Sequence, residues 1–167
     1  MSGVTLPINF KEKYKKLFFE AKKNLGLYNI EANVDSIEYA VVHWRRGDQN
    51  LRCSTNEDNS INCESAEALV NKIKHILSDG KYEHKRTYEE PSTMFHRESD
   101  PPRINPKNPP SVIYISTNEK NLSVLHLFQK NGFKTYKDLN FPHDLSPLDQ
   151  FIVDLQLMID SKYYLAW

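Results

Sequence analysis

The sequence predicts one α/β domain in which a parallel sheet lies between two layers of helices, a three-layer Rossmann-like arrangement. Two apolar runs, Tyr39–Val42 and Ser111–Thr117, are rich in β-branched and aromatic residues, as is typical of strands buried on both faces. Segments with apolar residues at helical spacing separate the two runs and follow the second. Because strands that alternate with helices favour parallel pairing, we expect a parallel sheet. A chain of 167 residues is long enough to bury one substantial core.

The composition limits the classes of function. Hydrophobic residues make up 39% of the chain and charged residues 26%, which indicates a globular protein rather than a disordered or membrane-spanning one. The 22 lysines and arginines equal the 22 aspartates and glutamates, so no overall charge favours nucleic acid or an acidic membrane surface. No apolar run has the length of a signal peptide core or a membrane span, so the chain as written is expected to be cytoplasmic.

The first 34 residues are expected to form an amphipathic helix and a linker, followed by the main domain over residues 35–167. The helix is predicted over residues 9–25, with Asn9 as its cap and Gly26 after its last turn. Its apolar face is expected to pack on the sheet. The helix also has a basic face, formed by Lys11, Lys15, Lys16, Lys22 and Lys23. This face is either a solvated exterior or a membrane-binding surface, and the solvated exterior is favoured.

Three further elements follow the first strand. A second helix is predicted over Ser65–Leu77, and a third over Glu119–Asn131, stopped by Gly132. Phe133–Leu139 is then expected to be a third strand. Between the second helix and the second strand, residues 81–111 contain many prolines and form either a loop over a binding site or a disordered insertion.

The last helix has the clearest start signal. Ser146 is suited to cap it, and Pro147 takes the first helical position. Apolar residues recur along one side of this helix and predict its buried stripe: Leu148, Ile152, Leu155 and Ile159. The third helix has a comparable apolar set, which is Leu122, Leu125, Leu127 and Phe128.

A polar cluster follows the first strand directly, with the sequence His43-Trp44-Arg45-Arg46-Gly47-Asp48. In parallel α/β sheets, ligands bind outside the carboxyl ends of the strands, and guanidinium groups there offer paired donors suited to a diphosphate. Asp48 is expected to orient one of the arginines. The alternatives are a surface salt-bridge pair for Arg45 and Arg46, and a core histidine for His43.

These residues resemble the first peptide motif of the GDP-fucose-dependent fucosyltransferases, the superfamily of protein O-fucosyltransferases, α1,6-fucosyltransferases and nodulation fucosyltransferases. The stretch VIYISTNEKN resembles the second motif, in which Ser116 and Thr117 end a strand. The stretch FIVDLQLMIDSKYYLAW resembles the third motif, whose helix carries an aspartate that binds guanine, and Asp154 aligns with that aspartate. The resemblance covers roughly residues 35–167.

The resemblance implies the fold of the C-terminal, donor-binding half of a GT-B glycosyltransferase. It implies inverting transfer of fucose from GDP-fucose to a hydroxyl of a protein or glycan, without a metal or a further cofactor. Arg45 would be catalytic, holding the β-phosphate and stabilising the departing GDP. The donor-binding set implied is His43, Arg45, Arg46, Asp48, Ser116, Thr117 and Asp154. The family also implies location in the endoplasmic reticulum or Golgi lumen.

Several alternatives stay open. From helical periodicity alone, Asp154 is more simply a solvent-facing carboxylate. In the family, a further domain supplies acceptor contacts, and the last strand leads into a serine-containing turn at the phosphates, whereas this sequence ends at Trp167. The alternative function is therefore a catalytically inactive GDP-sugar-binding fragment. Cys53 and Cys63 are either a loop disulfide or free thiols, and their spacing does not suit zinc.

Overall fold

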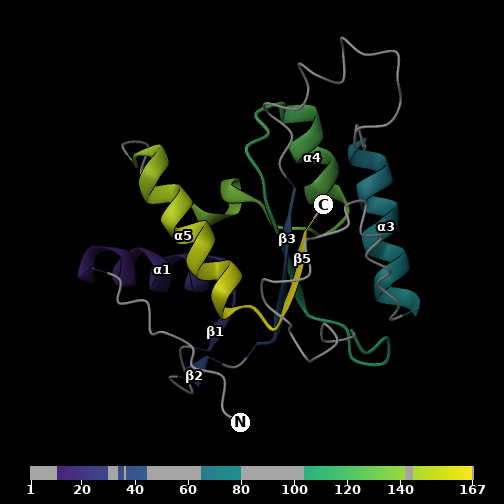
Figure 1. Cartoon of the computed structure of the whole chain (residues 1–167), viewed down its shortest axis with the longest axis horizontal. Coiled ribbons are helices and arrows are strands. Elements are labelled where there is room, and N and C mark those ends of the chain that lie inside the picture. Colours follow the sequence, from purple (N-terminus) through teal and green to yellow (C-terminus); the bar gives the residue numbers. More distant parts are fainter. Residues whose placement is uncertain are drawn as a thin grey trace, which may run out of the picture.

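Over the residues that it describes, the chain is an α/β structure with four α-helices and a three-stranded parallel sheet. The computed structural model describes residues 11–29, 34–35, 37–44, 65–79, 104–141 and 145–166. The strand β3 (Tyr39–His43) lies at the centre of the sheet, between β4 (Val112–Ser116) and β5 (Tyr163–Ala166) (Figure 1). Both neighbours run parallel to β3. A separate antiparallel pair is formed by β1 (Tyr28–Asn29) and β2 (Val34–Asp35).

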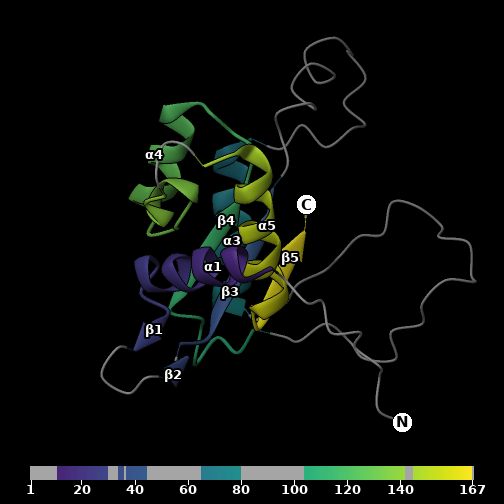
Figure 2. The same ribbon diagram turned by 90° about the vertical axis from the view of Figure 1, so that its left-hand side faces the viewer.

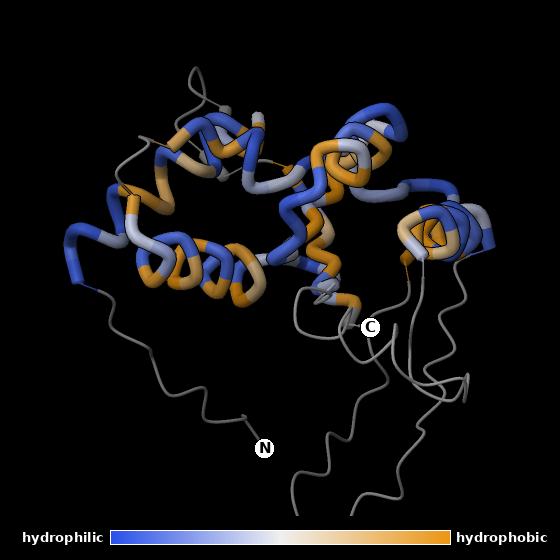
Figure 3. The backbone as a smooth tube through the Cα atoms, turned by 90° about the horizontal axis from the view of Figure 1, so that it is seen from above, coloured by the Kyte–Doolittle hydropathy of each residue, from blue (hydrophilic) through white to orange (hydrophobic). Residues whose placement is uncertain are grey.

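The helices form a layer on each face of the sheet. One layer consists of α3 (Ala66–Asp79) and α4 (Leu122–Lys130), and the other of α1 (Glu12–Asn24) and α5 (Pro147–Asp160) (Figures 1 and 2). Each layer closes its own apolar core over the sheet. Figure 3, seen from above, shows the apolar strands between the two groups of helices. This arrangement confirms the predicted α/β class with a parallel sheet, and it is compatible with a Rossmann-like fold.

The central strand is buried on both faces, as its uninterrupted apolar sequence predicted. Ala40 and Val42 contribute to the core under α3 and α4, whereas Tyr39 and Val41 contribute to the core under α1 and α5. This alternation follows from the two-residue repeat of side chains in a strand. The α1/α5 face of β3 therefore carries the odd-numbered residues of the strand.

The first helix packs on the sheet as predicted, but it begins later and buries one of its lysines. It starts at Glu12 with Lys11 in the cap position, and Asn9 lies outside the described residues. Lys22 was expected on the solvated side, and that expectation is wrong, because its side chain is buried. Its ammonium group lies 2.8 Å from a carboxylate oxygen of Asp160 on α5, so a partner compensates for the loss of water around this charge.

The expected third strand over Phe133–Leu139 is wrong. Only Lys134 pairs with β4, through a parallel bridge to Tyr114. A short 3-10 helix, η1 (Tyr136–Leu139), replaces the rest of the strand. The cause is local: the Thr135 hydroxyl accepts the amide of Lys137, and the Asp138 carboxylate accepts the amide of Thr135. Such a capping box offers the backbone an alternative to strand pairing.

The last helix starts as predicted, with the Ser146 hydroxyl accepting the amide of Asp149 at 3.1 Å, but its buried side is different. The predicted stripe is wrong: Leu148 and Ile159 are exposed, and Ile152 and Leu155 are only partly buried. The buried residues are Asp149, Val153, Asp154, Gln156 and Leu157. Apolar residues occur on both sides of this helix, so periodicity could not choose between them. Asp149, Asp154 and Asp160 have partners on α1 or β4, which orient the helix.

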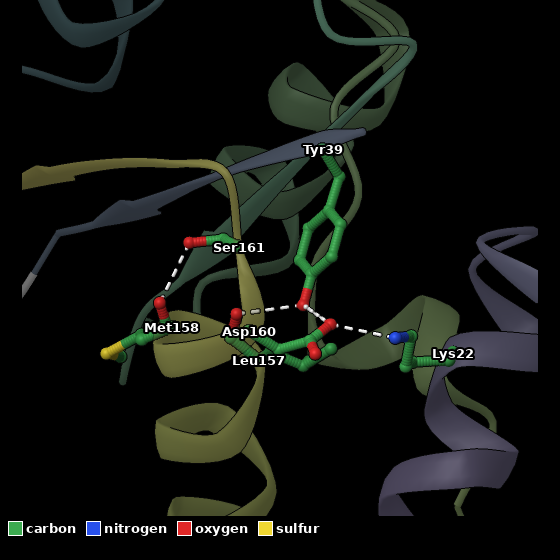
Figure 4. Close-up of polar contacts among 6 residues, drawn as sticks. All are labelled: Lys22, Tyr39, Leu157, Met158, Asp160 and Ser161. Carbon is green, nitrogen blue, oxygen red and sulfur yellow. Dashed lines mark hydrogen bonds and ion pairs between the residues drawn. The ribbon is translucent and has the colours of Figure 1, made fainter. Parts of the chain in front are cut away.

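A polar network fastens the end of α5 to the beginning of β3 (Figure 4). The hydroxyl of Tyr39 lies 2.9 Å from the carbonyl oxygen of Leu157 and 3.0 Å from the Asp160 carboxylate, and its single hydrogen is shared between them. The same carboxylate binds Lys22 of α1. Because α1, α5 and β3 meet in this network, it holds the C-terminal end of α5 against the sheet.

Candidate functional site

The carboxyl ends of the three strands coincide at one edge of the sheet. The last residue of β3, His43, is aligned with Ser116 at the end of β4 and with Ala166 at the end of β5. The amide of Trp44 continues the pairing by donating to the carbonyl oxygen of Ser116 at 2.9 Å. In parallel α/β sheets, ligands bind at this edge, near the point where the chain connections turn from one side of the first strand to the other.

Two of the donor-binding residues inferred from the sequence are neighbours on the α1/α5 face of this edge. His43 continues the series of Tyr39 and Val41 on that face, since side chains alternate along β3. Its register partner Ser116 projects to the same side, two residues after Tyr114. Parallel register therefore brings His43 beside Ser116.

Asp154 approaches the same face from α5. One of its carboxylate oxygens accepts a hydrogen bond from the Tyr114 hydroxyl at 2.6 Å, and the other accepts from the Ser116 hydroxyl at 3.2 Å. Asp154 is 8% exposed, so its interpretation as a solvent-facing carboxylate is wrong. The helix reaches over β4, and the carboxylate is enclosed between the helix and the strand.

This enclosure changes the acidity of the groups involved. Burial raises the pKa of Asp154 to about 6, although the hydrogen bonds from Tyr114 and Ser116 act in the opposite direction by favouring the charged form. Burial, together with the neighbouring Asp154 charge, raises the pKa of the Tyr114 hydroxyl well above its usual value. At neutral pH the site therefore holds a buried anion and two hydroxyl donors.

Two side chains, Thr117 and Glu119, hold the turn after β4. Of the two, only Thr117 belongs to the donor-binding set predicted from the sequence. The Thr117 hydroxyl accepts the amide of Glu119 at 3.1 Å. A carboxylate oxygen of Glu119 accepts the amides of Lys120 and Asn121, at 2.9 and 2.8 Å, and so occupies the entrance to α4. Glu119 precedes Asn121, the N-cap of α4, so its carboxylate lies near the positive end of the helix dipole. Thr117 thus has a structural role in shaping the edge of the site.

The other side of the same edge is apolar. Trp44 is buried in the core under α3 and α4, and its ring meets Phe128 of α4 edge to face, with ring centroids 5.4 Å apart. This contact anchors the residue that immediately precedes Arg45 in the sequence. Arg45, Arg46 and Asp48 lie outside the described residues, as do Cys53 and Cys63.

The sequence reasoning missed Tyr114, whose hydroxyl is the shorter of the two contacts to Asp154. A tyrosine among apolar residues of a buried strand was a usable signal, because a buried hydroxyl needs a hydrogen-bond partner. Within the described part of the chain, no group of three or more histidine, cysteine, aspartate or glutamate side chains could hold a metal ion. No helix among those residues is both long enough and apolar enough to cross a membrane.

Comparisons of the chain with protein-family models, with curated proteins and with solved structures give no match. The fucosyltransferase resemblance therefore depends on the three sequence motifs alone.

Proposed function

We propose that this chain binds GDP-fucose at the carboxyl ends of β3 and β4, as the donor-binding part of a fucosyltransferase with a Rossmann-like, GT-B type domain. The observation that carries the proposal is the meeting of residues from all three motifs at one place. Ser116 of the second motif donates to Asp154 of the third, although 38 positions separate them in the sequence. His43 of the first motif is the register partner of Ser116.

The chemistry of Asp154 suits recognition of guanine. Guanine presents two adjacent N–H donors, and a carboxylate is an acceptor with two lone pairs on each oxygen. Each oxygen of Asp154 accepts one protein hydroxyl and keeps capacity for a second donor. With a pKa of about 6, the group is ionised at neutral pH. Adenine does not present this pair of donors, so the site is expected to distinguish GDP from ADP.

The phosphates would be held by Arg45 and Arg46, which follow Trp44 directly in the sequence. Arg45 would neutralise the charge that develops on the β-phosphate as the bond to fucose breaks, which stabilises the transition state more than the ground state. The acceptor would be a hydroxyl of a protein or glycan, in the lumen of the endoplasmic reticulum or Golgi. The alternative is a GDP-sugar-binding chain without turnover of its own.

Calorimetric titration with GDP, GDP-fucose and ADP tests the proposal. We expect the wild-type chain to bind both guanine ligands more tightly than ADP. Arg45→Ala is expected to weaken GDP binding about tenfold to hundredfold, since a charge-assisted contact is worth roughly 1.5–3 kcal/mol. Asp154→Asn is expected to remove the preference for GDP over ADP.

The matched control is Lys130→Ala, which removes one positive charge from the exposed last turn of α4. It should leave GDP binding unchanged. A folded wild-type chain that binds none of the ligands, or one that binds ADP as tightly as GDP, would contradict the proposal. Incubation with GDP-fucose then separates the two functions: release of GDP in the presence of acceptor indicates transfer, and binding without release indicates the inactive fragment.

A further inference from the structure

The outward side of α5 is an apolar surface that runs the length of the helix. Leu148, Phe151 and Ile159 are 61%, 57% and 56% exposed, and Ile152 and Leu155 are half-buried between them. These five residues are here called the α5 stripe. Val153 and Leu157, on the other side of the helix, are fully buried against the sheet. A helix that carries apolar side chains on its outward side as well as toward the sheet is normally covered on both sides.

The α5 stripe contains no ionisable group. The helix has three carboxylates, and each is engaged by the rest of the chain: Asp149 by Lys13, Asp154 by Tyr114, and Asp160 by Lys22. The chain as a whole carries a formal net charge of zero at pH 7. Two copies that approach each other through this surface therefore meet neither local like charges nor long-range repulsion.

The spacing of the α5 stripe fits a helix of the same kind. Leu148, Ile152, Leu155 and Ile159 follow one another at intervals of four, three and four residues, which is the repeat that lets two helices interlock side chains along a common seam. Where the two-fold axis of a symmetric dimer crosses the seam at a right angle, the two helices run antiparallel. Ile152 of one copy then meets Leu155 of the other, and Leu148 meets Ile159.

We infer that the α5 stripe is the interface of a symmetric dimer formed by two copies of this chain. The area available is modest. With aromatic and aliphatic side chains about half exposed, two stripes would bury on the order of 1,000 Å² in total, at the lower limit for a specific complex. The dimer is accordingly weak and forms at high protein concentration. The inference does not depend on nucleotide binding.

Sedimentation equilibrium of the whole chain, between about 10 µM and 1 mM, tests this inference over the range where a small interface is populated. The weight-average mass is expected to rise from the 19.5 kDa of one chain toward twice that value. Phe151→Glu should hold the mass at that of the monomer. Leu122→Glu is the matched control, since Leu122 is an equally exposed leucine, 56% accessible, on α4 at the other face of the sheet. It should associate as the wild type does.

The antiparallel register gives a second, sharper test. Leu148→Lys and Ile159→Glu should each abolish the rise in mass, because each places a charge against an apolar residue of the other copy. The double variant should regain it, since lysine and glutamate then face each other at both ends of the seam. The two positions are too far apart along one helix to pair within a copy. A wild-type chain that stays monomeric, association that Leu122→Glu abolishes, or a double variant that stays dissociated would overturn the inference.

Discussion

Phe128→Ala is expected to lower the free energy of unfolding by about 3–5 kcal/mol, because the substitution removes a fully buried ring and leaves a cavity. The Phe128 ring lies at the centre of the core under α3 and α4 and supports Trp44 edge to face at the end of β3. The free energy of unfolding of a domain of this size is commonly about 5–15 kcal/mol, so this one substitution removes a large part of it. Urea unfolding followed by circular dichroism measures the effect.

The control for this substitution lies on the same helix. Leu122→Ala removes an exposed apolar side chain, and we expect it to change the free energy of unfolding by less than about 0.5 kcal/mol. If Phe128→Ala were as stable as Leu122→Ala, the packing of α4 on the sheet described above would be incorrect.

Asp154→Asn is expected to make the chain less sensitive to pH. Because burial raises the pKa of Asp154 from 3.8 to about 6, the folded chain keeps a proton at pH values where the unfolded chain has released it. The stability of the wild type therefore decreases as the pH rises from about 3 to about 7, and this group alone accounts for about 3 kcal/mol over that range. The asparagine variant lacks the group and should not show this decrease.

The difference in unfolding free energy between Asp154→Asn and the wild type should thus grow by about 2–2.5 kcal/mol from pH 4 to pH 7, in favour of the variant. Asp149→Asn provides a control of opposite sign. The hydrogen bond from Lys13 lowers the pKa of Asp149, so its contribution to stability is present at neutral pH and is lost as the pH falls below about 4. Asp149→Asn should therefore be less stable than the wild type at pH 7 and similar to it in acid. A constant difference for Asp154→Asn across this range would contradict the raised pKa of the buried Asp154 carboxyl.

The strands β3 and β4, the start of α5 and the end of α4 were predictable from the sequence because their causes are local. An uninterrupted apolar run such as Tyr39–Val42 is stable only where both faces are covered. Ser146 caps α5 through its own hydroxyl, and Gly132 takes the left-handed conformation, at φ 82°, that ends α4. Each of these signals depends only on residues that are close together in the sequence.

The errors in α1 and α5 came from choices that tertiary contacts decide, whereas the wrong strand over Phe133–Leu139 has a local cause in the capping box of η1. The α5 helix has two apolar sides, and only the partners of Asp149, Asp154 and Asp160 on other elements select the side that faces the sheet. The burial of Lys22 has the same origin, because its partner lies 138 positions away in the sequence. For the candidate site, helical and strand periodicity could not reveal the contact between Tyr114 and Asp154. The motif resemblance, in contrast, named Ser116 and Asp154 as candidate site residues.

Nuclear magnetic resonance of the ¹⁵N-labelled chain, titrated with GDP, tests the location of the proposed donor site most directly. We expect the amide signals of Trp44, Ser116 and Thr117 to shift in a saturable way, while those at the far end of the sheet, such as Val112 and Tyr163, stay in place. ADP at the same concentrations should produce much smaller shifts. GDP shifts that are absent, or that concentrate at the amino ends of the strands, would show that the strand ends formed by β3 and β4 are not a guanine nucleotide site.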